Sequence, residues 1–178
     1  MKLTASIRKP RRKIERLAAL RLAKALHALA VSTPRSVGNP ISAFGEITIV
    51  FAGDGVMAQV HFDAMGIEGS ADVVTIPYAA TPMASASAEI YVNVDLACER
   101  GVDRSELELI SSETSGDWSP EHELALYVAH GLDHLAGGDD STPEGFKEMR
   151  EREISWVRKA ERAGLLNSIF KPEVRKNG

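Results

Sequence analysis

Hydrophobic and polar residues alternate in four short segments, which is the pattern of β-strands with one buried face. In the last of these segments Ile90, Val92 and Val94 alternate with polar residues. Gly53 and Gly55 break the second segment, as expected where a strand ends in a turn. The alternation predicts strands over residues 3–7, 46–51, 72–78 and 89–94.

Elsewhere apolar residues recur at helical spacing, which places them on one face of an amphipathic helix. After Pro10, which the start of a helix tolerates, Leu22, Leu26 and Leu29 share such a face. Turn-forming residues separate this helix from its neighbours. Three further segments complete the first half of the chain: a short helix over 56–65 and loops over 32–40 and 79–88.

Two helix start signals mark the second half of the chain. Ser119 is a favourable N-cap residue and Pro120 suits a first turn, so a central helix is predicted from here to about Leu135. Thr142 and the proline after it repeat the signal, and the final helix is expected to end near residue 162. Its expected buried residues are Phe146, Met149, Trp156, Val157 and Ala160.

Together these elements predict an α+β fold in a single domain over residues 1–178. The expected architecture is a small mixed sheet of about four strands packed with about four to five helices. A chain of 178 residues is long enough to bury a substantial core. No element is assigned to residues 101–118, and the charged residues 171–178 are expected to form a mobile tail.

The composition is that of a soluble globular protein, with 44% hydrophobic and 26% charged residues. The single cysteine, Cys98, excludes an internal disulfide framework and fits a reducing compartment. No apolar run is long enough to span a membrane, and charged residues interrupt the N-terminal segment that faintly resembles a signal peptide. We therefore expect a cytoplasmic protein that does not bind a membrane.

Positive charge is concentrated near the N-terminus, although the net charge of the chain is −4. The segment 8–24 holds eight Lys and Arg residues and one acid, Glu15. A basic segment on an acidic protein can follow a phosphate backbone. The alternative interpretation is the solvated face of an amphipathic helix. The candidate RNA-binding residues of this first helix are Arg11, Arg12, Lys13 and Arg16.

The strongest chemical signal lies at the end of the predicted central helix. His130 and His134 are four residues apart, so both imidazoles project from one face. Two glycines then let the chain leave the helix sharply and return a carboxylate toward the imidazoles. Spacing favours Asp140 over Asp139 as that carboxylate. Two histidines and a carboxylate form the three-ligand arrangement of a catalytic zinc site, the alternative being two surface histidines beside an acidic loop.

A site of this kind is expected to hold one zinc ion per chain, with a water molecule in the open position. Such an ion lowers the pKa of its water toward ~7 and polarises a phosphoryl or carbonyl oxygen. His130, His134 and Asp140 are therefore the candidate catalytic residues, acting through the ion. Asp133, next to His134, is a further candidate that orients a ligand or accepts a proton, although a solvent-exposed aspartate is the favoured interpretation.

This stretch resembles the signature of the YbeY endoribonuclease family, His-Gly-x-x-His-Leu-x-Gly-x-x-His. Five fixed positions of the pattern are matched, by His130, Gly131, His134, Leu135 and Gly137. Asp140 stands where most members carry a third histidine and some branches of the family use aspartate. Asp133 stands where the family usually has an aliphatic residue.

The resemblance extends more weakly to two strands, over 71–77 and 88–92, and to the order of elements along the chain. One departure concerns an arginine that the family places shortly before the first of these strands, facing the substrate. Counting back from Asp72 puts Met65 at that position, and the residues between His61 and Asp72 include no Lys or Arg. Another residue then has to supply this positive charge, or the activity is reduced or changed.

The resemblance implies a zinc-dependent, single-strand-specific endoribonuclease that processes the 3′ end of 16S ribosomal RNA and acts in ribosome quality control. Its partners would be ribosomal RNA and the small ribosomal subunit, not DNA. A zinc metallopeptidase shares the ligand spacing, but its general base is a glutamate directly after the first histidine, where this chain has Gly131. The third hypothesis is a ribosome-assembly factor that binds RNA without cleaving it.

Overall fold

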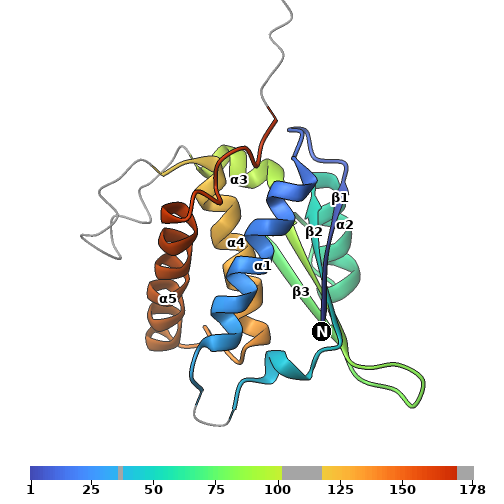
Figure 1. Ribbon diagram of the computed structural model, residues 1–178. Coiled ribbons are helices and arrows are strands. Elements are labelled where there is room, and N and C mark those ends of the chain that lie inside the picture. Colours follow the sequence, from blue (N-terminus) through green and yellow to red (C-terminus); the bar gives the residue numbers. More distant parts are fainter. Residues whose placement is uncertain (36–37, 102–117, 172–178) are drawn as a thin grey trace, which may run out of the picture.

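The computed structural model of the protein describes residues 1–35, 38–101 and 118–171 (Figure 1). The segment without an assigned element lies outside the described residues except for its two ends, Gly101 and Trp118. The expected mobile tail likewise lies outside them except for Lys171. Within the described part of the chain, no helix is long and apolar enough to cross a membrane.

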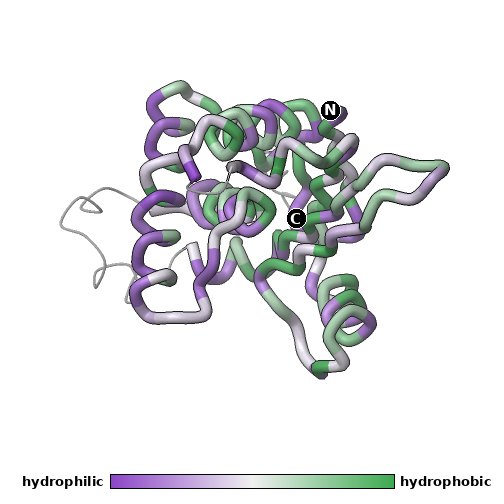
Figure 2. The backbone as a smooth tube through the Cα atoms, turned by 90° about the horizontal axis from the view of Figure 1, so that it is seen from below, coloured by the Kyte–Doolittle hydropathy of each residue, from purple (hydrophilic) through white to green (hydrophobic). Residues whose placement is uncertain are grey.

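All four expected strands are present in the described residues and form one mixed sheet in the order β1-β2-β4-β3. The neighbours β1, β2 and β4 run parallel, whereas β3 runs antiparallel to β4 at the edge. The strands are β1 (Lys2–Arg8), β2 (Glu46–Ala52), β3 (Val73–Tyr78) and β4 (Ser87–Asn93). The connection between β3 and β4 projects from the body and carries no charged residue over 79–86 (Figures 1 and 2).

Five α-helices and one 3-10 helix cover this sheet in the described residues. Three of the four α-helices predicted from the sequence agree with the structure to within two residues, and the α+β prediction is confirmed. The helices are α1 (Arg16–Ser32), α2 (Asp54–Met65), α3 (Val94–Arg100), α4 (Pro120–Leu135) and α5 (Pro143–Arg162), with the 3-10 helix at Pro40–Ala43.

The two faces of the sheet carry different helices (Figure 1). On one face Ile49 of β2 and Ile90 of β4 join the main core with α1 and α4. On the other face Val50 and Tyr91 form a smaller cluster with Met57 of α2. The central strands β2 and β4 are accordingly buried on both faces over most of their length.

Helix α1 begins later than the sequence pattern indicated. It starts at Arg16, where Glu15 caps it by accepting a hydrogen bond from the Leu17 amide, 3.3 Å away. The chain between β1 and α1 instead crosses the end of the sheet, and the Arg11 amide donates to Asp95 at 2.8 Å. The assignment of Arg11, Arg12 and Lys13 to a helix is therefore wrong, because the chain bends at residues 11 and 12 and the backbone of Arg11 and Lys13 bonds to distant residues.

Two other expectations also need correction. Helix α3 was not predicted, because Val94 continues the alternation of β4 although Asn93 caps a helix there by accepting from the Leu96 amide. Phe146 was expected in the core but is 41% exposed. It lies in the first turn of α5, where the guanidinium of Arg150 covers its ring at 5.3 Å. The other four residues expected to be buried in α5 are buried.

Asp133 is completely buried, so the favoured expectation of a solvent-exposed aspartate is wrong. Its carboxylate accepts hydrogen bonds from Arg35, in the loop after α1, and from Arg152 of α5, whose Nη2 lies 2.8 Å from Oδ2. A buried carboxylate is costly unless it is paired, and here two arginines pair with it. These contacts join three segments that are far apart in the sequence.

Helix α4 approaches the sheet closely at Gly131. A Cβ atom at this position would lie 2.3 Å from Cγ2 of Ile90 and 3.1 Å from Oγ1 of Thr75. Side-chain atoms do not approach so closely, so the position accepts glycine and little else. The glycine of the motif is thus explained by helix–sheet packing.

Replacing Gly131 by alanine is expected to destabilise the protein. Overpacking of a core costs about 1–3 kcal/mol, which exceeds the gain of up to about 1 kcal/mol in helix propensity. Gly55→Ala is the matched control, because Gly55 is also helical and a Cβ there meets nothing within 4 Å. Denaturant unfolding with a chelator present should place Gly131→Ala about 1–3 kcal/mol below Gly55→Ala. Equal stabilities would contradict this packing argument.

Candidate metal centre

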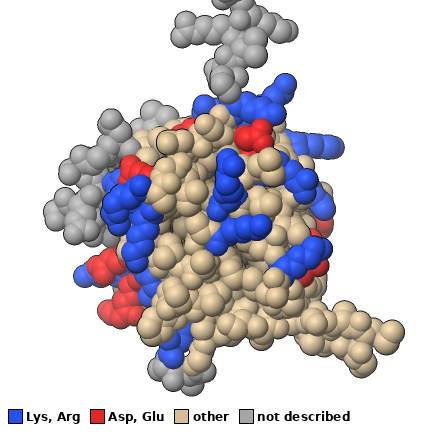
Figure 3. All heavy atoms as spheres, viewed as in Figure 1, with Lys and Arg blue, Asp and Glu red and all other residues tan. Residues whose placement is uncertain are grey.

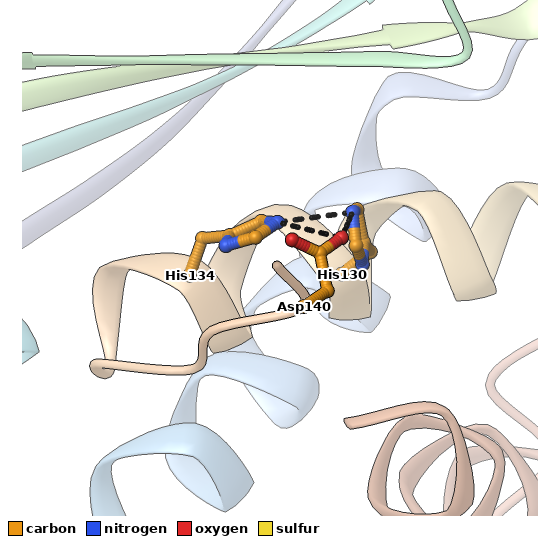
Figure 4. A group of neighbouring side chains, drawn as sticks. All are labelled: His130, His134 and Asp140. Carbon is orange, nitrogen blue, oxygen red and sulfur yellow. Dashed lines mark hydrogen bonds and ion pairs between the residues drawn. The ribbon is translucent and has the colours of Figure 1, made fainter. Parts of the chain in front are cut away.

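The two histidines of the motif lie on the one open side of α4. Twelve of the sixteen residues of this helix are buried, and beyond its first turn the exceptions are His130 and His134. Helix α4 ends at Leu135, and Gly137 then adopts a positive φ of 86°, which favours glycine. This turn carries Asp140 back over the imidazoles (Figure 4).

The three side chains converge on one point. Nε2 of His130 lies 3.1 Å from Nε2 of His134, and Oδ2 of Asp140 lies 3.7 Å from each of these nitrogens. Tetrahedral Zn²⁺ with ligand bonds of ~2.0–2.2 Å separates its ligand atoms by about 3.3–3.6 Å. The observed separations bracket that range, so the donor set fits a zinc ion in both chemistry and spacing. The side chains are 22%, 31% and 35% exposed, which leaves the group open to a substrate.

The far nitrogen of each imidazole also has a partner. Nδ1 of His130 lies 2.8 Å from Oε1 of Glu153 in α5, and Nδ1 of His134 lies 3.3 Å from the carbonyl oxygen of Gly138. Both partners accept hydrogen bonds, so each Nδ1 can donate its proton there and leave Nε2 to ligate a metal ion. The imidazoles therefore present the atoms that a metal ion needs.

The environment of His130 also affects its protonation. Burial lowers the pKa of His130, but the hydrogen bond to Glu153 and the negative charge of that carboxylate raise it more. The net pKa lies above the ordinary value of about 6.5. The raised pKa strengthens the competition of a proton with a metal ion for Nε2.

Of the two adjacent aspartates, the structure brings Asp140 to the histidines. Oδ1 of Asp139 accepts a hydrogen bond from the Ser141 amide at 2.9 Å, which holds the loop. Asp133 also stays outside the group, because its carboxylate lies between Arg35 and Arg152.

Glu153 was missed by the sequence analysis. It is 1% exposed and interrupts the buried stripe of α5 between Met149 and Val157. An acid at a position where helical spacing calls for an apolar residue is the signal that could have identified it.

Met65, at the position of the expected family arginine, is the last residue of α2. It is 55% exposed at the end of α2, on the face of the sheet opposite α4. A cation of α5 does lie beside the group, because Nη1 of Arg150 is 3.6 Å from Oε2 of Glu153.

Comparisons with known proteins agree with the motif. A family model described as Endoribonuclease YbeY matches residues 7–161. An endoribonuclease YbeY of Rhodopirellula baltica is 29% identical over 111 residues, which cover 62% of this chain and 52% of that protein. The Campylobacter fetus protein of the same name is 29% identical over 125 residues, which cover 70% of this chain and 80% of that protein.

The fold also has a solved counterpart. The solution structure of a Thermotoga maritima protein matches with a TM-score of 0.52 and 17% identity, covering 98% of this chain and 99% of that one. At this identity the likeness concerns the fold alone. The family model, in contrast, spans most of the sequence and includes the whole motif from His130 to Asp140. This chain therefore belongs to the YbeY endoribonuclease family.

Proposed function

We propose that this protein is a cytoplasmic, zinc-dependent endoribonuclease that cleaves single-stranded RNA. The proposed substrate is the 3′ region of the small-subunit 16S ribosomal RNA, in its maturation and in ribosome quality control. The observation that carries the proposal is the convergence of His130, His134 and Asp140 within a chain of this family. All ligand atoms of this group lie within 4.8 Å of one another.

In this proposal His130, His134 and Asp140 hold one zinc ion per chain. When bound, such an ion acidifies a coordinated water toward a pKa of ~7 and polarises a phosphoryl oxygen. Asp140 supplies a negative charge where most relatives have a neutral imidazole, so it weakens that acidification. The partly exposed side chains leave the phosphodiester access from the solvent side of α4.

The packing of Gly131 argues against the metallopeptidase alternative. That chemistry requires a carboxylate directly after the first histidine, pointing at the metal-bound water. Position 131 points instead into the contact between α4 and the sheet, where even a Cβ meets Ile90. A side chain at this position therefore could not act as a general base, whatever its type.

Two of the candidate RNA-binding residues expected from the sequence, Arg11 and Arg12, have partners within the protein. Arg11 is paired with Asp95 and Glu99, at 3.2 and 2.8 Å. The guanidinium of Arg12 stacks over the ring of Phe170 at 4.4 Å. These three contacts supply structural roles for the two arginines, so neither is a simple exposed cation.

The exposed cations suited to RNA lie on α1 and just before it. Figure 3 shows Lys and Arg side chains over the central part of the face that α1 forms, with Asp and Glu nearer its edges. Helix α1 shares the main core with α4, in which Leu22 and Leu26 of α1 and Leu132 of α4 are buried. We propose that an RNA longer than the cleaved segment follows this face, through Lys13, Arg16, Arg21 and Lys24.

Cleavage is expected to depend on the metal group and to be specific for RNA. Single-stranded RNA containing the 16S 3′ region should be cut, and chelator or His134→Ala should abolish cutting because the zinc ligands are lost. His61→Ala is the matched control, since His61 lies on α2. A casein digestion assay run in parallel should show no activity.

The three function hypotheses give different results in this experiment. RNA binding without cleavage, with every metal tried, would support the assembly-factor hypothesis and overturn the nuclease proposal. Casein digestion that is lost in His130→Ala would support the peptidase.

Reversing single charges on the α1 face tests the RNA path. Arg21→Glu or Lys24→Glu should weaken binding of a long RNA and lower its salt slope by about 1, because a phosphate contact is lost. Lys2→Glu, the same change at a lysine already paired with Glu46 at 2.9 Å, is the control. Cleavage of a short oligonucleotide should remain unchanged. An unaltered salt slope in both α1 variants would mean that this face is only a solvated helix surface.

A further inference from the structure

The buried carboxylate of Glu153 contacts the metal group through His130. Its side chain is 1% exposed, and Oε1 lies 2.8 Å from Nδ1 of His130. The other carboxylate oxygen, Oε2, lies 3.6 Å from Nη1 of Arg150, one turn earlier on α5. Glu153 therefore lies between an imidazole and a guanidinium, and the two oxygens are turned to different partners.

We infer that Glu153 is the positioning residue of the metal centre, which keeps the proton of His130 on Nδ1 and presents a bare Nε2 to the metal. This inference rests on the proposed function, because it assigns a role in zinc binding. Glu153 does not touch the metal position. It acts through His130, whose ring orientation and tautomer it fixes.

The burial of Glu153 supports this role. Its neighbours along the buried stripe of α5 are Met149 and Val157, so an apolar residue would fill the position without the cost of burying a charge. Replacing buried ion pairs by apolar residues of similar volume is often neutral or stabilising. Fold stability alone therefore does not account for a glutamate here, whereas the orientation of a metal ligand does.

The two histidines receive unequal support from their surroundings. His134 relies on a backbone carbonyl at 3.3 Å, a longer contact to a neutral group, while His130 has a charged acceptor at 2.8 Å. Charge-assisted hydrogen bonds are shorter and stronger than neutral ones. Glu153 thus makes His130 the better oriented and more electron-rich ligand, and Arg150 offsets the negative charge that Glu153 adds beside Asp140.

Two substitutions separate orientation from packing. Glu153→Leu keeps a side chain of similar volume and removes the hydrogen-bond acceptor of His130. Glu153→Gln keeps a neutral amide oxygen that can still accept from Nδ1. Zinc affinity should fall about 10–100-fold in Glu153→Leu and less in Glu153→Gln. In the metal-free protein, at a pH high enough to leave the His130 ring neutral, nitrogen-15 NMR should find the Nδ1–H tautomer of His130 in the wild type and in Glu153→Gln, and its loss in Glu153→Leu. His134 should be unchanged in all three.

A purely structural role gives different results. Glu123→Gln is the control, because Glu123 is a buried acid of α4 that accepts from Nε1 of Trp118 at 2.8 Å. It should leave zinc affinity and the His130 tautomer unchanged. Wild-type zinc affinity in Glu153→Leu, or an Nε2–H tautomer in the metal-free wild type, would overturn the inference.

The tautomer measurement also separates this inference from the proposed function. A wild-type protein that binds no zinc would contradict the proposed function. The NMR of metal-free His130 would still decide the role of Glu153, even if Glu153→Leu did not fold, since the wild type and Glu153→Gln give the comparison.

Discussion

Helix α4 is held on several sides at once, and the position of the metal group depends on that packing. At Gly131 the helix backbone lies against Ile90 and Thr75 of the sheet, closer than any side chain would allow. On another side α5 contributes Glu153 to His130 and Arg152 to Asp133. Because these contacts fix the last turns of α4, the two imidazoles point to the same place.

Buried charge is the unusual feature of the contact between α4 and α5. Asp133 and Glu153 are 0% and 1% exposed, and each pairs with an arginine of α5. Asp133 also pairs with Arg35, in the loop after α1. Buried ions of this kind specify geometry more than they add stability. One of these carboxylates fixes the helix to its neighbours, and the other reaches a metal ligand. The same helix pair therefore serves both architecture and chemistry.

Local patterns predicted much of this protein. Alternation identified all four strands, and the cap residues before Pro120 and Pro143 placed the starts of α4 and α5. The spacing of the histidines and the glycine turn identified Asp140 correctly as the nearby carboxylate, because a turn immediately after a helix is itself local.

Contacts between distant parts of the chain could not be predicted in this way. The start of α1 was misplaced because Arg11 bonds to Asp95, a residue 84 positions away. Asp133 was expected in solvent because its partner Arg35 is 98 positions away. Likewise, no pattern near His130 indicates that Glu153 lies behind it. Periodicity reports which face of an element is buried, but not which partner that face meets.

The central claim is that two imidazoles and the Asp140 carboxylate bind one zinc ion. X-ray absorption at the zinc edge, on protein loaded with one equivalent, tests it most directly. The account predicts nitrogen and oxygen neighbours at about 2.0–2.1 Å, with multiple scattering from two imidazoles. In Asp140→Ala the two imidazoles should remain while an oxygen neighbour is lost or replaced by solvent. Scattering from three imidazoles, or from sulfur at about 2.3 Å, would contradict the claim, because it would require a ligand outside this group.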